Sequence, residues 1–190
     1  RDRSPSRGLG DVYKRQIVWF DISANKKKSQ KRTKGGSYIN EEEKRIILEI
    51  LDDLKSTGEL KGLDIGIITG YSGQKELLRK SIKATGLDKI ASKIDINTLD
   101  AFQGRENDII IYSTVRTRDS IGFQKEKERV NVAFSRAKKL LIVCGDKNFF
   151  YNFDDQDNKF VEIIDYISEG EECEIIQCDG GKLFERESNS

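Results

Sequence analysis

The chain of 190 residues has no histidine, no methionine, one proline and three cysteines. The absence of histidine excludes mechanisms that use an imidazole as base, which leaves carboxylates, arginine, lysine, hydroxyls and backbone amides for any chemistry. The cysteines, Cys144, Cys173 and Cys178, are too few for a disulfide framework, and without histidine they indicate no zinc site. We interpret them as small buried residues or free thiols, and we expect no metal site in this chain.

Long apolar runs are also absent. The chain as a whole is polar, with 36% hydrophobic and 35% charged residues. No run approaches the ~20 apolar residues of a membrane-spanning helix, and the charged first residues do not resemble a secretory leader. We therefore expect an intracellular protein, cytoplasmic or nuclear, without membrane contact. The apolar residues come in short dense runs, which suffice for the core of one domain.

The two ends of the chain differ in charge and pattern. Residues 1–16 lack helical and strand periodicity, and we interpret them as a non-native leader, similar to translated sequencing-adapter read-through, on a chain truncated upstream. Residues 1–34 carry eleven Lys and Arg against three Asp, and residues 154–190 carry twelve Asp and Glu against three Lys and Arg. A basic end can contact phosphate groups, although solvated ends are the favoured interpretation.

Apolar runs and amphipathic segments alternate along residues 17–170. Runs typical of buried strands cover residues 17–22, 65–69, 94–98, 109–115 and 140–144. Helical periodicity marks the segments that follow Asn40 and Gly73, residues 128–138, and a final helix face formed by Phe160, Ile163, Ile164 and Ile167. Asn40 and Glu43 stand in capping-box positions. The alternation predicts an α/β fold, a parallel sheet with helices on both faces. Residues 171–190 remain as an acidic tail with one candidate edge strand at 174–176.

Three polar segments flank these strands, and ligands of parallel sheets bind near strand ends. In the first, Thr69 ends the run 65–69 and Tyr71 follows it, and these two residues suit phosphate contact and base stacking on a single nucleic-acid strand. An ordinary turn with Tyr71 packed inside explains the same residues. In the second segment, residues 97–108, Gly104 allows close backbone approach to a ligand and Glu106 can accept hydrogen bonds from sugar hydroxyls.

The alternative for the second segment is a solvated loop in which Asp100 and Arg105 pair with each other. The third segment lies within the helix expected at 128–138, where Arg129, Ala133 and Arg136 share a face. Arg136 offers an always charged, forked group of the kind that stabilises a phosphoryl group during transfer. A basic solvated helix is the simpler explanation of this segment alone.

Taken together, the three segments resemble motifs IV, V and VI of superfamily 1 helicases, closest to the branch of the nonsense-mediated-decay RNA helicases and the replication nuclease-helicases. The matching words are Gly66-Ile67-Ile68-Thr69-x-Tyr71-x-x-Gln74, Thr98-x-Asp100-x-Phe102-Gln103-Gly104-Arg105-Glu106-x-Asp108 and Arg129-x-Asn131-Val132-Ala133-x-Ser135-Arg136-Ala137-Lys138, with Ser37-x-x-Asn40-x-x-Glu43 upstream. The chain departs from the family at Gly70, where proline is usual, and this leaves the placement of Tyr71 less constrained.

The resemblance implies the RecA-like fold of P-loop NTPases, as the second of two such domains in an ATP-dependent DNA or RNA helicase. It assigns Arg136 as the arginine finger and places Gly104 and Glu106 beside the nucleotide, with Glu106 at the ribose. It also implies that four residues face single-stranded DNA or RNA: Thr69, Tyr71, Thr98 and Gln103. ATP with Mg²⁺ is the implied cofactor, and the Mg²⁺ ligands are expected on the missing first domain.

The sequence has no phosphate-binding loop of the form G-x-x-x-x-G-K-[S/T], so this fragment alone is expected to be inactive. Its expected partner is the N-terminal RecA-like domain of the same parent chain. The main alternative function is a RecA-like module that binds nucleic acid without hydrolysing ATP. A less favoured alternative is an interaction domain that docks through its acidic tail.

Overall fold

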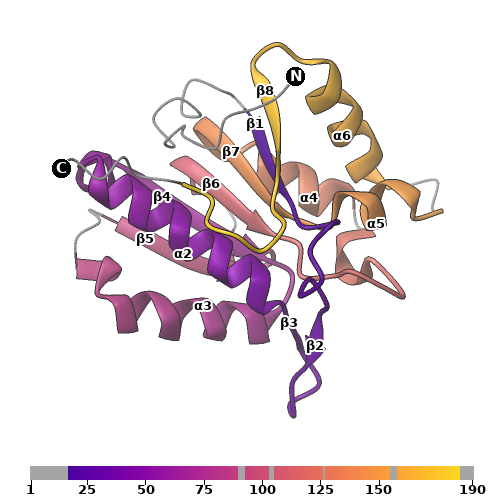
Figure 1. Ribbon diagram of the computed structural model, residues 1–190, viewed down its shortest axis with the longest axis horizontal. Coiled ribbons are helices and arrows are strands. Elements are labelled where there is room, and N and C mark those ends of the chain that lie inside the picture. Colours follow the sequence, from indigo (N-terminus) through magenta and orange to yellow (C-terminus); the bar gives the residue numbers. More distant parts are fainter. Residues whose placement is uncertain (1–16, 90–92, 103–104, 126, 155–157, 185–190) are drawn as a thin grey trace.

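A six-stranded parallel sheet forms the centre of the molecule in the computed structural model, which describes residues 17–89, 93–102, 105–125, 127–154 and 158–184 (Figure 1). The strands lie in the order β5-β4-β6-β7-β1-β8, and every pair is parallel. Their bounds are β1 (Ile17–Asp21), β4 (Asp64–Thr69), β5 (Lys93–Thr98), β6 (Asn107–Ser113), β7 (Ala137–Gly145) and β8 (Cys173–Gln177).

Helices cover both faces of this sheet. One face carries α2 (Glu41–Ser56) and α3 (Ser72–Thr85), and the other carries α4 (Lys127–Phe134), α5 (Lys147–Asn152) and α6 (Lys159–Glu169). Shorter elements are the antiparallel pair β2 (Lys31–Arg32) and β3 (Tyr38–Ile39) and the 3₁₀ turns η1 (Glu59–Gly62), η2 (Leu87–Lys89) and η3 (Gly122–Lys125). The predicted α/β architecture is confirmed. Within the described residues, no helix is both long and apolar enough to cross a membrane.

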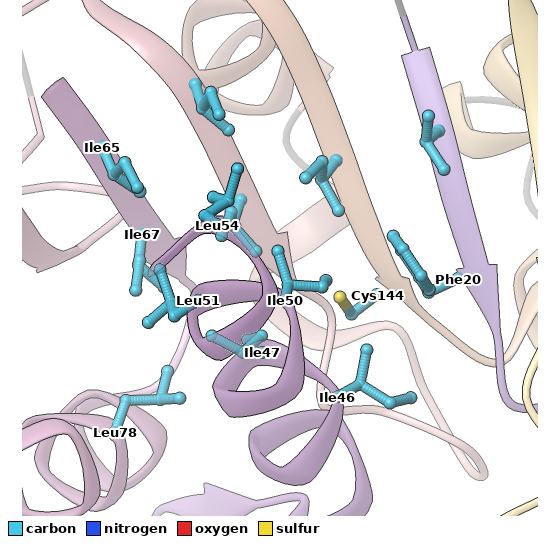
Figure 2. Packing of buried hydrophobic residues seen from close by; sticks show 14 of the residues in the cluster. Phe20, Ile46, Ile47, Ile50, Leu51, Leu54, Ile65, Ile67, Leu78 and Cys144 are labelled. Carbon is cyan, nitrogen blue, oxygen red and sulfur yellow. The ribbon is translucent and has the colours of Figure 1, made fainter. Parts of the chain in front are cut away.

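Helix α2 supplies the centre of the first core. Its apolar side chains follow the predicted helical spacing and are completely buried against the sheet: Ile46, Ile47, Ile50, Leu51 and Leu54. Figure 2 shows them between Ile65 and Ile67 on one side and Phe20 and Cys144 on the other, which come from three strands. Burial of one such side chain stabilises the fold by ~1.5–3 kcal/mol, so this helix face contributes a large share of the driving force for folding.

The second core, on the opposite face, is aromatic. Trp19 makes edge-to-face contacts with Phe150 and Phe160, with ring centroids 6.5 and 6.2 Å apart. The indole N–H of Trp19 donates to the carbonyl oxygen of Gly145 at 3.0 Å, which satisfies its only polar atom inside the core. This arrangement anchors α5 and α6 to the sheet.

The acidic C-terminal segment takes part in the fold. The candidate strand at 174–176 is confirmed as β8, which pairs with β1 at the edge of the sheet. The chain then crosses toward α2, where the ring of Phe184 packs edge-to-face on Phe20 at 6.5 Å and the N–H of Leu183 donates to Glu49 at 2.8 Å. All three cysteines are free thiols, and Cys144 and Cys178 are buried, as the sequence predicts.

The predicted helix over 128–138 is too long. Helix α4 ends at Phe134, and β7 begins at Ala137 rather than at 140. Ala137 pairs with Asn107 at the start of β6, and the N–H of Asn107 donates to the carbonyl oxygen of Arg136 at 3.1 Å. Because the chain from Ala137 onward pairs in the sheet and cannot continue the helix, Arg136 lies in the connection between α4 and β7. It therefore does not share a helix face with Ala133.

Candidate functional site

The residues that the sequence singles out lie at two opposite ends of the sheet. Glu106 and Arg136 stand at the amino ends of the neighbouring strands β6 and β7. Thr69 and Thr98 are the last residues of β4 and β5, at the carboxyl ends. The sequence-based expectation that ligands gather at the carboxyl ends therefore applies to the second group alone.

At the amino ends, the segments that precede β6 and β7 are joined directly. The hydrogen bond from the Asn107 N–H to the Arg136 carbonyl brings the residue after Glu106 next to the arginine. Glu106 is exposed and Arg136 is half-buried. A carboxylate open to solvent and a guanidinium thus flank one edge of the sheet, as they would to bind a ligand with both hydroxyl and anionic groups.

The Arg136 guanidinium is incompletely satisfied. Its Nε atom is buried and has no hydrogen-bond partner among the described residues. The side-chain oxygen Oδ1 of Asn107 is likewise buried and lacks a partner among them. A buried N–H without an acceptor costs ~1–3 kcal/mol, so the fold keeps this donor at a cost in stability. The rest of the guanidinium is partly accessible, and its N–H groups fit a phosphate group.

At the carboxyl ends, Thr69 and Thr98 are direct partners in the parallel register, and the Leu99 N–H donates to the Thr69 carbonyl at 2.9 Å. Thr98 is half-exposed, whereas Thr69 is completely buried. The Thr69 hydroxyl accepts from the Tyr71 N–H at 3.4 Å. Of these two threonines, Thr98 is therefore the one with surface for a ligand.

Tyr71 is packed inside, with 4% of its surface exposed. Its ring makes an edge-to-face contact with Tyr38 at 5.7 Å, and burial raises the pKa of its hydroxyl. This is the alternative considered from the sequence, a turn with Tyr71 packed. Arg105, which the second alternative pairs with Asp100, forms an ion pair with Asp95 at 2.5 Å. Gln103 and Gly104 lie outside the described residues.

Sequence reasoning missed the role of Glu43. Asn40 caps α2 as predicted, since its side chain accepts from the N–H groups of Glu42 and Glu43 at 3.1 Å. The second half of the predicted capping box is wrong, because the Asn40 N–H donates to Gln74 Oε1 at 2.8 Å instead of to Glu43. The Glu43 carboxylate turns into the protein and faces the end of β6.

Three neighbouring residues at that end donate to the Glu43 carboxylate. The hydroxyls of Ser113 and Thr114 donate at 2.5 and 3.0 Å, and the Val115 N–H donates at 2.8 Å. Burial of the carboxyl group raises its pKa from 4.5 to about 7, and these hydrogen bonds oppose the shift. The available signal in the sequence was the polar pair Ser113-Thr114 directly after an apolar strand, which indicates a buried polar partner.

Glu43 holds a strained turn. Val115 has a φ of 67°, a left-handed conformation that a β-branched residue rarely adopts. Its N–H is bonded to Glu43, and its carbonyl oxygen accepts from Asn40 Nδ2 at 3.2 Å. The turn directs the Arg116 guanidinium over the ring of Tyr38, 4.1 Å from its centroid. The start of α2 thus sets the path of the chain as it leaves β6.

Comparison with known proteins identifies the class. The family model described as an AAA domain matches residues 5–148, well over half of the chain, and the chain belongs to this family. Its relatives include the DNA polymerase alpha-associated DNA helicase A of Saccharomyces cerevisiae, which is 35% identical over 153 residues covering 76% of this chain and 21% of the relative.

Two further relatives locate the branch. The ATP-dependent helicase NAM7 of Saccharomyces cerevisiae is 36% identical over 146 residues, 75% of this chain and 14% of its own length. The regulator of nonsense transcripts 1 homologue of Neurospora crassa is 38% identical over 116 residues, 59% of this chain and 10% of its own. The chain is thus a helicase-family domain of the superfamily 1 branch that the motifs resemble, and it spans about a fifth or less of these relatives.

Among solved structures, the C-terminal domain of a possible DNA helicase from Lactobacillus plantarum WCFS1 aligns with 75% of this chain and 88% of its own, at 16% identity and a TM-score of 0.43. That likeness is too distant to carry an argument about fold or function. The assignment rests on the family match and on the sequence relatives.

Proposed function

We propose that this chain is the second motor domain of an ATP-dependent superfamily 1 helicase. It supplies Arg136 as an arginine finger to ATP held by a preceding RecA-like domain, and it supplies part of the track for single-stranded DNA or RNA. The observation that carries this proposal is the half-buried guanidinium of Arg136 at the same sheet edge as Glu106. The accessible part of that group can donate to a phosphate brought by a second domain.

In this proposal, each of the site residues has one task. Arg136 stabilises negative charge on the γ-phosphate, Glu106 accepts from the ribose, and Gly104 gives the nucleotide close access to the backbone. Thr98 and Gln103 contact the strand, while Thr69 and Tyr71 support that surface from beneath. The Mg²⁺ ligands and the phosphate-binding loop belong to the preceding domain. ATP hydrolysis supplies the free energy for movement along the strand.

The opposite placement of the two groups supports coupling between them. An interdomain closure that brings Arg136 to the nucleotide moves the whole sheet as one body, so the strand-facing edge moves at the same time. When the γ-phosphate is released, the contact with Arg136 is lost and the domains separate. Each cycle then becomes a step along the strand.

The test is ATP hydrolysis by the complete parent protein, with and without single-stranded nucleic acid. Arg136→Ala is expected to lower the strand-stimulated rate by ~10³–10⁵-fold and to leave strand binding nearly unchanged. Lys80→Ala, which removes an exposed cation on α3, is the control and should hydrolyse ATP normally. Normal turnover by Arg136→Ala would contradict the proposed finger. Strand binding without hydrolysis by the wild type would favour the binding-module alternative.

A further inference from the structure

The hairpin built on β2 and β3 concentrates positive charge. Between Ile22 and Asn40 the sequence has six Lys and Arg and no Asp or Glu. We call residues 25–39 the basic hairpin, and Figure 1 shows it in indigo, extending beyond the body of the molecule. Its exposed cations are Lys26, Lys27, Lys31, Arg32 and Lys34. The sixth, Lys28, forms an ion pair with Asp146 at 2.7 Å.

The basic hairpin is fixed to the rest of the protein. The N–H of Gln30 donates to the Thr117 hydroxyl at 3.2 Å, and the N–H of Thr117 donates to the Gln30 side chain at 2.8 Å. At the far side, the N–H of Gly73 donates to the Ser37 hydroxyl at 3.0 Å. These bonds hold the cations in a defined position relative to the sheet and α3.

Most of the positive charge of the basic hairpin has no ion-pair partner in the part of the chain that the structure describes. For the five exposed cations, no ion pair is found among the residues that the structure describes. Like charges held within a Debye length of ~8 Å repel one another at physiological salt, so the ordered hairpin carries an electrostatic cost. A polyanionic partner would remove this cost, and the spacing of the cations along a ribbon suits a linear one.

The basic hairpin borders the edge of the sheet at which β4 and β5 end, where the proposed function places the nucleic-acid strand. Tyr38, at its base, contacts the ring of Tyr71, which follows β4, and lies under the guanidinium of Arg116, which follows β6. Its Ser37 contacts the first turn of α3. The hairpin and the carboxyl ends of β4 and β5 therefore belong to one continuous region of the molecule.

We propose that the basic hairpin binds the sugar–phosphate backbone of a single nucleic-acid strand and extends the track beyond the carboxyl ends of the sheet. The proposal rests on the proposed function, because that function brings a strand to this edge. Cations on flexible stems recognise phosphates without reading bases, so the contact serves DNA and RNA alike and is indifferent to sequence. An acidic protein segment is disfavoured, because the hairpin is continuous with the edge that receives the strand.

The experiment measures binding of labelled oligothymidylate and oligouridylate to the 190-residue chain and to the complete parent over a series of salt concentrations. The hairpin variant is Lys31→Gln/Arg32→Gln/Lys34→Gln. The matched control is Lys55→Gln/Lys80→Gln/Lys83→Gln, which removes the same charge from exposed positions on α2 and α3. Circular dichroism establishes that both variants fold as the wild type does.

The hairpin variant is expected to bind on the order of tenfold more weakly at physiological salt, with the slope of log K against log salt reduced by ~2, or ~0.7 for each lost phosphate contact. The control variant should keep the wild-type slope. If the hairpin variant and the control bind alike while the wild type binds the strand, the hairpin proposal is overturned and an acidic protein partner or bare solvent is left for this surface. If the complete wild type binds neither oligonucleotide at low salt, the proposed function itself fails.

Discussion

Glu43 is a carboxyl group enclosed by donors and by apolar side chains. Its titratable neighbours, Tyr112 and Cys144, have pKa values raised by burial and stay neutral at physiological pH. The pKa of Glu43 itself is about 7, above the ordinary value of 4.5. At pH values between these two, Glu43 binds a proton in the folded protein and releases it in the unfolded chain. The free energy of unfolding must therefore fall as pH rises through this interval, by up to ~1.4 kcal/mol per pH unit from this group.

Glu43→Gln is expected to abolish this contribution to the pH dependence, because the amide does not titrate. At neutral pH the variant should lose ~1–3 kcal/mol, since the amide N–H₂ cannot accept from the donors that surround the carboxylate. Urea denaturation between about pH 5 and about pH 8 measures both effects. Glu169→Gln, at an exposed position, is the control. Parallel pH profiles for wild type and Glu43→Gln would contradict the assignment.

Gly66 marks a close approach between the sheet and the segment that follows β5. A Cβ atom there would lie 2.6 Å from the ring of Phe102 and 2.8 Å from Ile110. Gly66→Ala should therefore destabilise the fold by ~1–3 kcal/mol through overpacking. Gly62→Ala, where a Cβ would meet nothing within 4 Å, is the matched control. Equal unfolding midpoints for the two variants would show that the Phe102 segment shifts freely.

The Asn40 and Glu43 pair shows how far sequence reasoning reaches at this scale. The N-cap was predictable, because it depends on local geometry and a side chain that accepts from its own helix. The orientation of Glu43 was not, since its position at N3 fits a capping box equally well. Glu43 turns inward because Ser113, seventy residues further along the chain, donates to its carboxylate. The position of Ser113 depends on the sheet, which the local sequence around Glu43 does not reveal.

At the scale of elements, strand β7 and helix α4 compete for the same residues. Ala137, Lys138 and Lys139 favour helix by propensity, which is why the sequence predicts one helix through 138. Pairing of Ala137 with Asn107 overrides that preference. The five strands predicted from apolar runs were all found, because a continuous buried run is a strong local signal, whereas their ends depend on partners that the run does not reveal.

Helix α2 offers a test of capping against long-range bonding. Asn40→Asp keeps the acceptor that caps the helix but loses the Nδ2 donor to the carbonyl oxygens of Lys28 and Val115, at 2.8 and 3.2 Å. The loss should destabilise the protein by ~1–3 kcal/mol despite the preserved cap. Thermal unfolding measures the change, and Asn148→Asp, at an exposed position on α5, controls for the added charge. An unchanged melting temperature would mean that Asn40 acts only as a cap.

At the scale of the whole molecule, the acidic C-terminal segment closes the core. β8 protects the edge of β1, and Phe184 lies on Phe20 at the far side of the first core. From its composition alone this segment is an acidic tail, because its Asp and Glu residues outnumber its Lys and Arg residues. Return of residues 183 and 184 to a strand more than 160 positions earlier leaves no periodic trace in the sequence, so it could not be predicted.

Removal of residues 171–190 should lower stability by several kcal/mol, because it uncovers the edge of β1 and the apolar surface beneath Phe184. The point variant Phe184→Ser is expected to reproduce part of that loss, whereas Lys182→Ser, at an exposed position beside it, should not. Differential scanning calorimetry compares the three. A shortened chain that melts like the full one would show that the acidic segment adds nothing to the fold.

Strand β6 runs from the sheet edge that holds Glu106 and Arg136 to the edge at which Thr69 ends β4, with a register shift against β7 between Asn107 and Ile109. It begins at Asn107, bonded to the backbone of Arg136, and ends at Ser113, bonded to Glu43. Seven residues of extended chain span on the order of 20 Å, and the strand is paired on both sides. Because β6 is hydrogen-bonded to a strand on each side, we expect it to move with the sheet as one rigid body. A displacement at the Arg136 end of the strand should then be accompanied by a displacement at the Ser113 end.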